Sequence, residues 1–228
     1  MSNCQNCPQA GKHPFCGLGS QARAFLDANS TVVDYPRGAS LFHEGTSSDS
    51  VYMLCSGRVK ITASSSEGKT AILRIASAGD VVGLSAALNK TSYETSAEAI
   101  EPCKIRILQN RLLMQLLTQF GDASMAATSM IAQHYRAAFQ EIRRIALPDS
   151  PAGRVARLIL DWAESGRTMP ASTITIPLTH EELASMTATT RETVTRTLSR
   201  FRREKLIATK GISLTILQPA QLRQLCAC

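Results

Sequence analysis

Three charged residues near the carboxyl terminus, Arg191, Glu192 and Arg196, have the types and the spacing needed to read DNA base pairs. An arginine can donate two parallel hydrogen bonds to O6 and N7 of guanine in the major groove, and a glutamate can accept one from N4 of cytosine. The simpler alternative is a solvated amphipathic helix, which charge-rich faces commonly form. The residues predicted to bind DNA are Arg191, Glu192, Thr195, Arg196, Ser199 and Arg200.

Two short helices must position these side chains. Thr179 is followed three residues later by Glu182, a spacing that predicts a capping box at the start of the first helix. Thr189 or Thr190 begins the second helix, and Thr189 with Glu192 has the same capping-box spacing. Apolar residues at helical spacing would pack the two helices together; they are Leu183, Met186, Val194, Leu198 and Phe201. The pattern predicts a helix-turn-helix.

Charge and a following hairpin support the DNA-binding interpretation. The window 189–210 contains seven basic and two acidic residues, so it carries +5 of the chain's formal net charge of +7. Two apolar runs flank Lys210 and Gly211 and predict a β-hairpin. A helix-turn-helix followed by a hairpin is a winged helix, and its basic surface favours double-stranded DNA as the partner.

The region 31–108 has a different pattern, and the length of 228 residues allows two domains. Short apolar runs are separated at frequent intervals by glycine, at Gly38, Gly45, Gly57, Gly68, Gly79 and Gly83. Many short strands with turn signals between them predict an all-β sandwich or barrel.

Residues 107–146 predict a helix that is interrupted near Phe120, Gly121 and Asp122. In its second part, the residues at three- and four-residue steps are Met130, His134, Ala137, Glu141, Ile142 and Ile145. This narrow seam is typical of a two-stranded helix pair, and a protein that reads two half-sites usually needs two copies. The sequence therefore favours a homodimer, with packing of the helix against its own β-domain as the alternative.

Three cysteines, Cys4, Cys7 and Cys16, lie in an amino-terminal segment with little hydrophobic periodicity. A C-x2-C pair can hold one metal or one cluster, because two intervening residues let the chain curl round the site. Cys4 and Cys7 are also compatible with zinc binding or with a redox disulfide.

Catalysis by the same thiols, as in a thiol or iron–sulfur redox enzyme, has little support, since the pair lacks the βαβ context of a thioredoxin-like site. The sequence contains no Ser-His-Asp constellation, P-loop or G-x-G-x-x-G motif, and we expect a protein that is not an enzyme.

Residues 189–216, with the sequence TTRETVTRTLSRFRREKLIATKGISLTI, are similar to the DNA-binding end of the Crp/Fnr superfamily of bacterial transcription regulators. The resemblance extends back to about residue 20, and the stretches SLFHEGTSSDSVYMLCSGRVKI and GDVVGLSAAL resemble the cyclic-nucleotide-binding β-roll of that superfamily. It implies an α+β fold with a β-roll, a long dimerisation helix and a winged helix-turn-helix. The expected parts are a cysteine-bearing segment (1–18), a β-roll sensor domain (19–108), a dimerisation helix region (109–147) and a DNA-binding domain (148–228). Contact with RNA polymerase is also implied by the resemblance.

The cysteines acquire a more specific interpretation from the same resemblance. In the Fnr branch, three amino-terminal cysteines and one distant cysteine ligate a [4Fe–4S] cluster that oxygen destroys. The matching residues here are Cys4, Cys7, Cys16 and Cys103, although the spacing C-x2-C-x8-C has a longer third interval than the enterobacterial pattern. The resemblance implies a redox- or oxygen-responsive regulator. Zinc or thiol sensing and the absence of a cofactor remain alternatives, because a buried cysteine such as Cys103 is often only a small apolar residue.

Cyclic AMP is not expected as a ligand. The cyclic-AMP receptor branch has a Gly-Glu-Leu motif and an arginine about ten residues later that bind the cyclic phosphate. Here the first motif is Gly83-Leu84-Ser85, and the position of the arginine falls near Tyr93, beside Glu94. A carboxylate would repel a phosphate, so the β-roll is expected to keep its fold without this ligand.

No apolar run approaches the ~18 residues that are needed to span a membrane. The amino-terminal sequence lacks the hydrophobic core of a secretory signal. These features predict a protein of the cytoplasm, a compartment in which thiols stay reduced and disulfides are uncommon.

Overall fold

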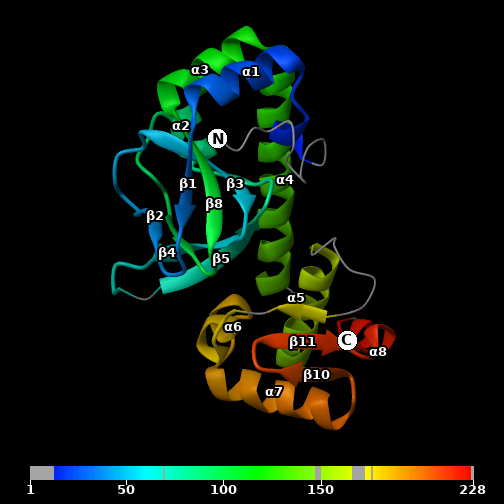
Figure 1. Ribbon diagram of the computed structural model, residues 1–228. Helices are drawn as coiled ribbons and strands as arrows, with labels where there is room; N and C mark the ends of the chain where they lie inside the picture. Colours follow the sequence, from blue (N-terminus) through cyan, green and yellow to red (C-terminus); the bar gives the residue numbers. More distant parts are fainter. Residues whose placement is uncertain (1–12, 69, 147–149, 166–172, 176, 227–228) are drawn as a thin grey trace. The chain divides into compact units, whose positions relative to one another are not determined.

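The computed structural model describes residues 13–68, 70–146, 150–165, 173–175 and 177–226. The chain divides into two compact units, Met1–Ala138 and Phe139–Cys228, and the boundary between them falls within one long helix. Figure 1 shows the strands of the first unit and the helix-rich second unit. Each unit is described below by itself.

The first unit contains two antiparallel four-stranded sheets. One sheet has the order β1-β8-β3-β6, with β1 Thr31–Tyr35, β8 Cys103–Gln109, β3 Ser50–Ser56 and β6 Val81–Val82. The other has the order β2-β7-β4-β5, with β2 Ser40–Phe42, β7 Ser96–Ala99, β4 Arg58–Ser64 and β5 Thr70–Ser77. This arrangement confirms the predicted β-roll, whose frequent glycines lie in turns between short strands.

The β3–β8 pair separates two apolar cores, because successive side chains along a strand point to opposite faces. Leu54 and Ile105, which are register partners, belong to the core between the two sheets. Val51 and Leu108, also register partners, belong to the other core, which is covered by helices. A side chain on this sheet therefore faces either the interior of the β-roll or the helices.

Among the described residues of this unit, the helices are the 3₁₀ helix η2 Pro14–Gly17, α1 Ser20–Asn29, α2 Leu84–Asn89 and α3 Asn110–Gln119. The long helix α4 Gly121–Ala146 begins in this unit and continues past its boundary. The predicted interruption is confirmed, because Phe120 has an extended backbone between α3 and α4. The prediction that the helix begins at Ile107 is wrong, since β8 continues to Gln109. Pairing with β3 as far as Ser50 holds these residues in the sheet.

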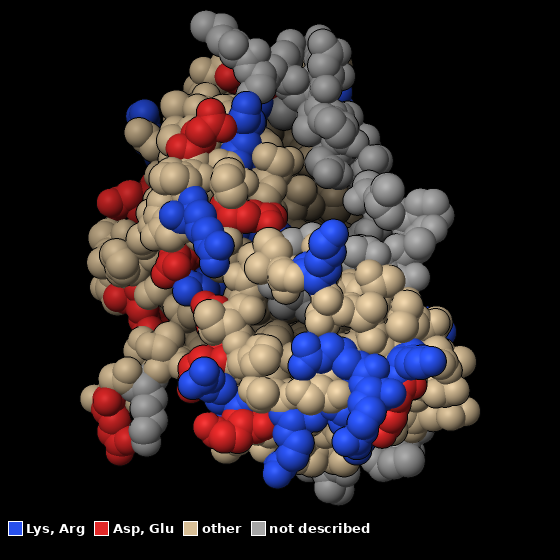
Figure 2. Space-filling model, turned by 60° about the horizontal axis from the view of Figure 1, so that its bottom comes forward, with Lys and Arg blue, Asp and Glu red and all other residues tan. Residues whose placement is uncertain are grey.

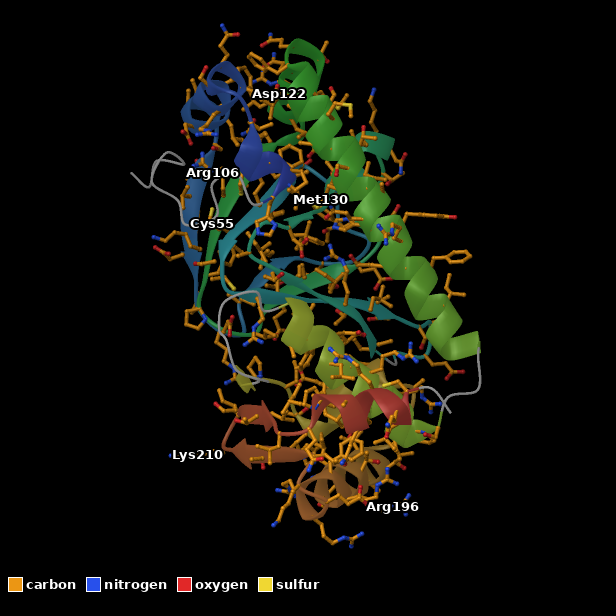
Figure 3. All side chains as sticks on the ribbon, turned by 90° about the vertical axis from the view of Figure 1, so that its right-hand side faces the viewer. Cys55, Arg106, Asp122, Met130, Arg196 and Lys210 are labelled. Atoms are coloured by element: carbon orange, nitrogen blue, oxygen red, sulfur yellow. The ribbon has the colours of Figure 1, made fainter. Side chains whose placement is uncertain are left out.

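The long helix α4 packs part of its predicted seam against its own unit. Met130 is buried in the helix-covered core, and the ring of His134 is half-buried with its Nε2 atom 3.9 Å from Oδ1 of Asp80 (Figure 3). Both residues pack against their own unit, so their assignment to an intersubunit seam is wrong. The exposed apolar residues of α4 are Met125, Ile131, Tyr135, Phe139 and Ile142. These five lie along one side of the helix, roughly opposite Met130.

After the end of α4, the second unit contains α5 Pro151–Ser165 and, near its carboxyl end, α8 Pro219–Leu225. Between them lie the helices α6 His180–Met186 and α7 Arg191–Arg203. A three-stranded sheet has the order β10-β11-β9. Its strands are β10 Ile207–Lys210, β11 Ser213–Ile216 and β9 Thr173–Thr175. The hairpin β10–β11 is the predicted wing. No helix in the described ranges has the length and apolar character needed to cross a bilayer.

A buried ion pair fastens α1 to the sheet of the first unit. The side chain of Arg106, on β8, is only 4% exposed, and its Nη2 atom lies 2.8 Å from Oδ1 of Asp27 on α1 (Figure 3). Its Nη1 atom donates to Oγ of Ser30 at 2.6 Å. A carboxylate that pairs with a buried guanidinium is important for stability, since breaking a buried ion pair is costly.

Replacing Asp27 with Ala should therefore lower the free energy of unfolding by roughly 3 kcal/mol. Urea unfolding would measure this change. The matched control is Asp34→Ala, which removes an exposed carboxylate 3.8 Å from Nζ of Lys104 and should cost less than about 1 kcal/mol. Equal losses in the two variants would show that the buried pair contributes no more than a surface pair.

Candidate nucleic-acid interface

The first helix of the helix-turn-helix, α6, begins with the predicted capping box. The hydroxyl of Thr179 accepts a hydrogen bond from the backbone N–H of Glu182 at 3.2 Å. The carboxylate of Glu182 accepts one in return from the backbone N–H of Thr179 at 2.8 Å. Two backbone donors that the helix itself leaves unsatisfied are paired in this way, so the start of α6 is fixed.

The second helix, α7, begins at Arg191 with Thr190 as its N-cap. The hydroxyl of Thr190 accepts from the backbone N–H of Thr193 at 3.3 Å. The predicted capping box between Thr189 and Glu192 is therefore wrong, because the cap lies one residue later. Glu192 is left with an exposed side chain, and hydrogen bonds from its own backbone N–H and from the Thr190 hydroxyl hold the pKa of its carboxyl below the ordinary value.

One side of α7 is buried within its own unit. Val194 and Phe201 are fully buried, and Leu198 is nearly so. Leu183 and Met186 of α6 are buried as well, as the helical spacing predicted. Burial of this side fixes the rotation of α7 about its axis and turns the polar side outward.

The turn between α6 and α7 is held by an arginine from another helix. Nε of Arg154, on α5, donates to the carbonyl of Thr187 at 2.7 Å, and its Nη2 atom donates to the carbonyl of Ala188 at 3.1 Å. Ala188 has a φ of 47°, which an alanine rarely adopts. No local pattern indicated this contact, since Arg154 precedes the turn by more than thirty residues.

Thr195 is engaged inside the protein. Its Oγ1 atom lies 2.8 Å from Nδ1 of His180 at the start of α6 and donates to the carbonyl of Arg191 at 2.9 Å. Because the Thr195 hydroxyl donates its proton to that carbonyl, it accepts a hydrogen bond from His180 when Nδ1 of the ring carries the proton. Thr195 therefore fixes the two helices to each other, and its hydroxyl proton is not directed at a base.

Arg191, Glu192 and Arg196 are all exposed on the first two turns of α7. Within the described residues, neither guanidinium of this group makes an ion pair or a side-chain hydrogen bond. Their donors are therefore available to an external acceptor, which is the condition for reading guanine.

The last two predicted residues are held by neighbouring side chains. Nε of Arg200 lies 3.6 Å from Oε1 of Glu204, and its guanidinium lies 5.5 Å from the centre of the Phe201 ring. Ser199 accepts from Nη2 of Arg202 at 3.0 Å. The predicted residues therefore fall into two groups. Arg191, Glu192 and Arg196 are exposed charged side chains, whereas Thr195, Ser199 and Arg200 already contact other side chains of the protein.

Basic side chains extend beyond the predicted set. Arg202, Arg203, Lys205 and Lys210 are also exposed. Figure 2 shows lysine and arginine side chains gathered on this face of the second unit, and Figure 3 labels Arg196 on α7 and Lys210 on the wing. Arg203 was not singled out, although its place seven residues after Arg196 puts both on one side of the helix.

The β-roll positions that bind a cyclic phosphate in the receptor branch have a different character here. Leu84 is buried. Tyr93 is also buried, with its ring stacked on Phe42 at 4.0 Å between centroids and its hydroxyl donating to the carbonyl of Ser50 at 2.6 Å. Glu94 stands within 3.5 Å of the Ser85 hydroxyl. These side chains bring no positive charge to the position.

The four predicted cluster ligands are not brought together by the described residues. Cys4 and Cys7 lie outside the described ranges, and Cys16 is half-buried in η2. Cys103 is buried in the core between the sheets, where its thiol lies 3.2 Å from the carbonyls of both Arg58 and Glu101. Burial raises the pKa of the Cys103 thiol. The described residues contain no cluster of three metal-binding side chains.

The geometry of the two units defines a winged helix-turn-helix protein with a β-roll domain. Residues 153–225 match the model of the Crp-like helix-turn-helix domain, and residues 32–120 match that of the cyclic nucleotide-binding domain. The chain belongs to the Crp/Fnr family and is a DNA-binding transcription regulator.

Similar proteins support this assignment. The chain is 28% identical over 204 residues to the CRP-like cAMP-activated global transcriptional regulator of Mycobacterium tuberculosis, covering 89% of this chain and 91% of that protein. It is 26% identical to the cAMP-activated global transcriptional regulator CRP of Salmonella typhimurium, covering 80% and 87%. FixK2 from Bradyrhizobium japonicum has the same fold, with a TM-score of 0.78 at 22% identity over 86% of this chain and 96% of that one. A CRP-family transcriptional regulator from Thermus thermophilus aligns with a TM-score of 0.72 at 25% identity over 86% and 97%.

Replacing Arg196 with Ala should weaken binding to the preferred duplex by about 1–3 kcal/mol, or roughly 5- to 150-fold, and relax the preference at one base pair. Competition of variant duplexes for the purified protein would measure both effects. The matched control is Arg200→Ala, another arginine of α7 whose guanidinium is held by Glu204 and Phe201. It should change the affinity little. If Arg196→Ala instead weakened binding equally for every sequence, Arg196 would be a phosphate contact.

Proposed function

We propose that the chain acts as a cytoplasmic homodimer that binds a two-fold-related DNA site and responds to redox state through its amino-terminal cysteines. The observation that carries the DNA-reading part is the pair of exposed guanidiniums, Arg191 and Arg196, on a helix whose start and rotation are fixed by the protein. Contact with RNA polymerase belongs to the proposal because regulators of this family act on transcription.

Dimerisation through α4 is supported by its exposed apolar side. Tyr135 is 67% exposed and Phe139 is 54% exposed, and Ile131 and Ile142 lie on the same side of the helix. Leaving such a stripe in water is unfavourable, and a second copy of the same helix would bury it as in a coiled coil. A two-fold dimer would need its recognition helices ~34 Å apart to enter successive major grooves.

A signal other than cyclic AMP is supported by the interior of the β-roll. The Mycobacterium and Salmonella relatives are named as cAMP-activated. In this chain, the positions that would meet the cyclic phosphate carry Leu84, Tyr93 and Glu94, and the Tyr93 hydroxyl is already bonded to the protein. A phosphate requires a positive partner, which these side chains do not supply.

The redox part of the proposal assigns Cys4, Cys7, Cys16 and Cys103 as ligands of a [4Fe–4S] cluster. When bound, the cluster would supply an oxygen-labile iron–sulfur centre that thiolates hold. Zinc or thiol chemistry at the same cysteines is the second candidate, since a C-x2-C pair serves both.

The residues on both sides of Cys16 contact α4 or a turn that contacts α4. The backbone N–H of Gly19 donates to Oδ2 of Asp122, at the start of α4, at 2.7 Å (Figure 3). The turn at Gly79 and Asp80 touches His13 through Gly79 and His134 of α4 through Asp80. Burial by itself raises the pKa of the Asp80 carboxyl, but His134, Arg74 and the Ser77 N–H outweigh it and lower that pKa. Asp80 is therefore an anion at neutral pH, and a change in the cysteine segment would reach α4 through Asp122 and His134.

Replacing Tyr135 with Glu should dissociate the dimer, because it places charges in the centre of the proposed helix pair. Sedimentation velocity would show the mass falling to that of one chain, with a matching loss of affinity for the two-fold site. The control is Gln133→Glu, an exposed residue of α4 outside the apolar stripe, which should stay dimeric. A Tyr135→Glu protein that remains a dimer would place the interface elsewhere.

Protein purified without oxygen should contain iron and acid-labile sulfide and absorb visible light, and exposure to air should remove that absorption. Elemental analysis and an absorption spectrum before and after exposure would measure this. A colourless protein that contains zinc would contradict the iron–sulfur cluster and favour zinc binding at the same cysteines. Saturable heat of binding on titration with cyclic AMP would contradict the conclusion drawn from Tyr93.

A further inference from the structure

A polar cleft lies in the first unit where three separate segments of the chain meet. Its volume is about 490 Å³, and it is bordered by the turn before β3, the end of α2 and the start of α3. Figure 1 shows α2 and α3 at the same end of the β-strands. A volume of this size is sufficient for a small organic ligand.

Most of the side chains that line the cleft can donate hydrogen bonds. Four of them carry hydroxyl groups, Ser47, Ser48, Thr91 and Ser92, and Asn110 carries an amide. The Asn110 amide donates to the carbonyl oxygen of Ser48 at 2.6 Å and contacts its hydroxyl oxygen at 3.1 Å. This contact fixes the turn before β3 against the start of α3, so the donors of these two segments are held together before a ligand binds.

Two positive charges border the cleft without a negative partner. Lys90 directly follows α2 and Arg111 lies in the first turn of α3, and both side chains are exposed. Among the described residues, neither makes an ion pair or a side-chain hydrogen bond. No aspartate or glutamate is among the described residues that line the cleft. Asp49, which accepts from the Ser47 hydroxyl at 3.2 Å, is outside that lining. The charge of the cleft therefore favours an anion.

Lys90 has a backbone conformation in which lysine is uncommon. It caps α2 with a φ of 55° and a ψ of 41°, and its backbone N–H donates to the carbonyl of Ala86. Glycine is the usual residue at such a cap, because it has no Cβ atom to meet the backbone. Lysine brings a charge to the cleft that glycine would not. Lys90→Gly is therefore a variant that removes the ammonium group and suits the local backbone.

One part of the cleft is apolar. Met114 follows Arg111 by three residues, so the two lie on the same face of α3, and Met114 is 38% exposed. Ala87 of α2 also lines the cleft. The flexible thioether of methionine adapts to the shape of a bound organic group. A free phosphate would leave this part of the cleft uncovered, whereas an organic group attached to the phosphate would cover it.

We propose that the cleft binds a small phosphate monoester, with the phosphate between Lys90 and Arg111 and the organic group against Met114. A terminal phosphate carries about 1.5 to 2 negative charges and three acceptor oxygens, which match two cations and several hydroxyl donors better than a carboxylate does. The site is separate from the position of a cyclic phosphate in the receptor branch, because Leu84 and Tyr93 do not line the cleft. It includes no cysteine and no residue of α7, so it goes beyond the proposed function.

Isothermal titration calorimetry of the full-length protein tests the proposal. The probes are adenosine monophosphate and glucose phosphate, with adenosine, glucose and inorganic phosphate as the separate halves. At least one ester should bind saturably and more tightly than either of its halves. Absence of saturable binding by both esters would overturn the proposal. Equal affinity for inorganic phosphate and for the esters would overturn the assignment of an organic ligand and restrict the cleft to free phosphate.

Two variants assign the binding to the cleft. Lys90→Gly and Arg111→Ala should each weaken binding of the ester by roughly tenfold, because each removes a charge-assisted hydrogen bond. The matched control is Arg37→Ala, which removes an exposed arginine of the same unit that does not line the cleft. Arg196→Ala is the second control, since the basic face of α7 also attracts phosphates. Both controls should keep the wild-type affinity. Loss of binding in Arg196→Ala with retention in Lys90→Gly would overturn the proposal.

Hydrogen–deuterium exchange locates the ester without any substitution. On saturation, peptides that cover residues 47–48, 87–92 and 110–114 should exchange more slowly, whereas those of α7 should be unchanged. Protection confined to α7 would place the ester on the DNA-binding face and overturn the proposal. These measurements require neither DNA nor the cysteines, so a negative result here is distinguishable from a failure of the redox and dimer proposals.

Discussion

Burial of one side of α7 is the constraint on which the DNA-binding surface depends. Val194 and Phe201 are removed from water completely, and burying an apolar side chain of this size stabilises a fold by about 1.5–3 kcal/mol. Rotation of the helix would expose them, so their burial fixes which residues face outward. Arg191 and Arg196 face solvent because their neighbours at helical spacing are in the core. The Thr190 cap and the Arg154 contacts with the turn fix the position of the same helix along its axis.

The β3–β8 sheet imposes a comparable constraint on the first unit. Its two faces support separate cores, and a shift of one residue along a strand moves a side chain from one core to the other. The surroundings of a cysteine on this sheet therefore depend on which core its side chain faces. Cys103 packs inside the β-roll, while Cys55 lies where the register of β3 and β8 shifts.

The helix α4 also has two different sides. Ala123, Ala127 and Met130 pack into their own unit, and the opposite side leaves Ile131, Tyr135 and Phe139 in solvent. Small residues on the inner side let the helix approach the β-roll closely. This exposed apolar side is the reason for proposing that α4 pairs with a second copy of the chain.

Local periodicity and short-range chemistry were enough to predict the capping box of α6, the wing hairpin, the strand-rich region, the break at Phe120 and the concentration of positive charge. Each of these features depends on residues within a few positions of one another. Four others became visible only in the folded chain: which side of α4 is buried, the bond of Thr195 to His180, the closing of the turn by Arg154, and the burial of Cys103 between the two sheets. Those outcomes depend on contacts between residues that are distant in the chain. A periodic pattern shows that a helix or strand has two different sides, but it does not show which part of the protein will cover each side.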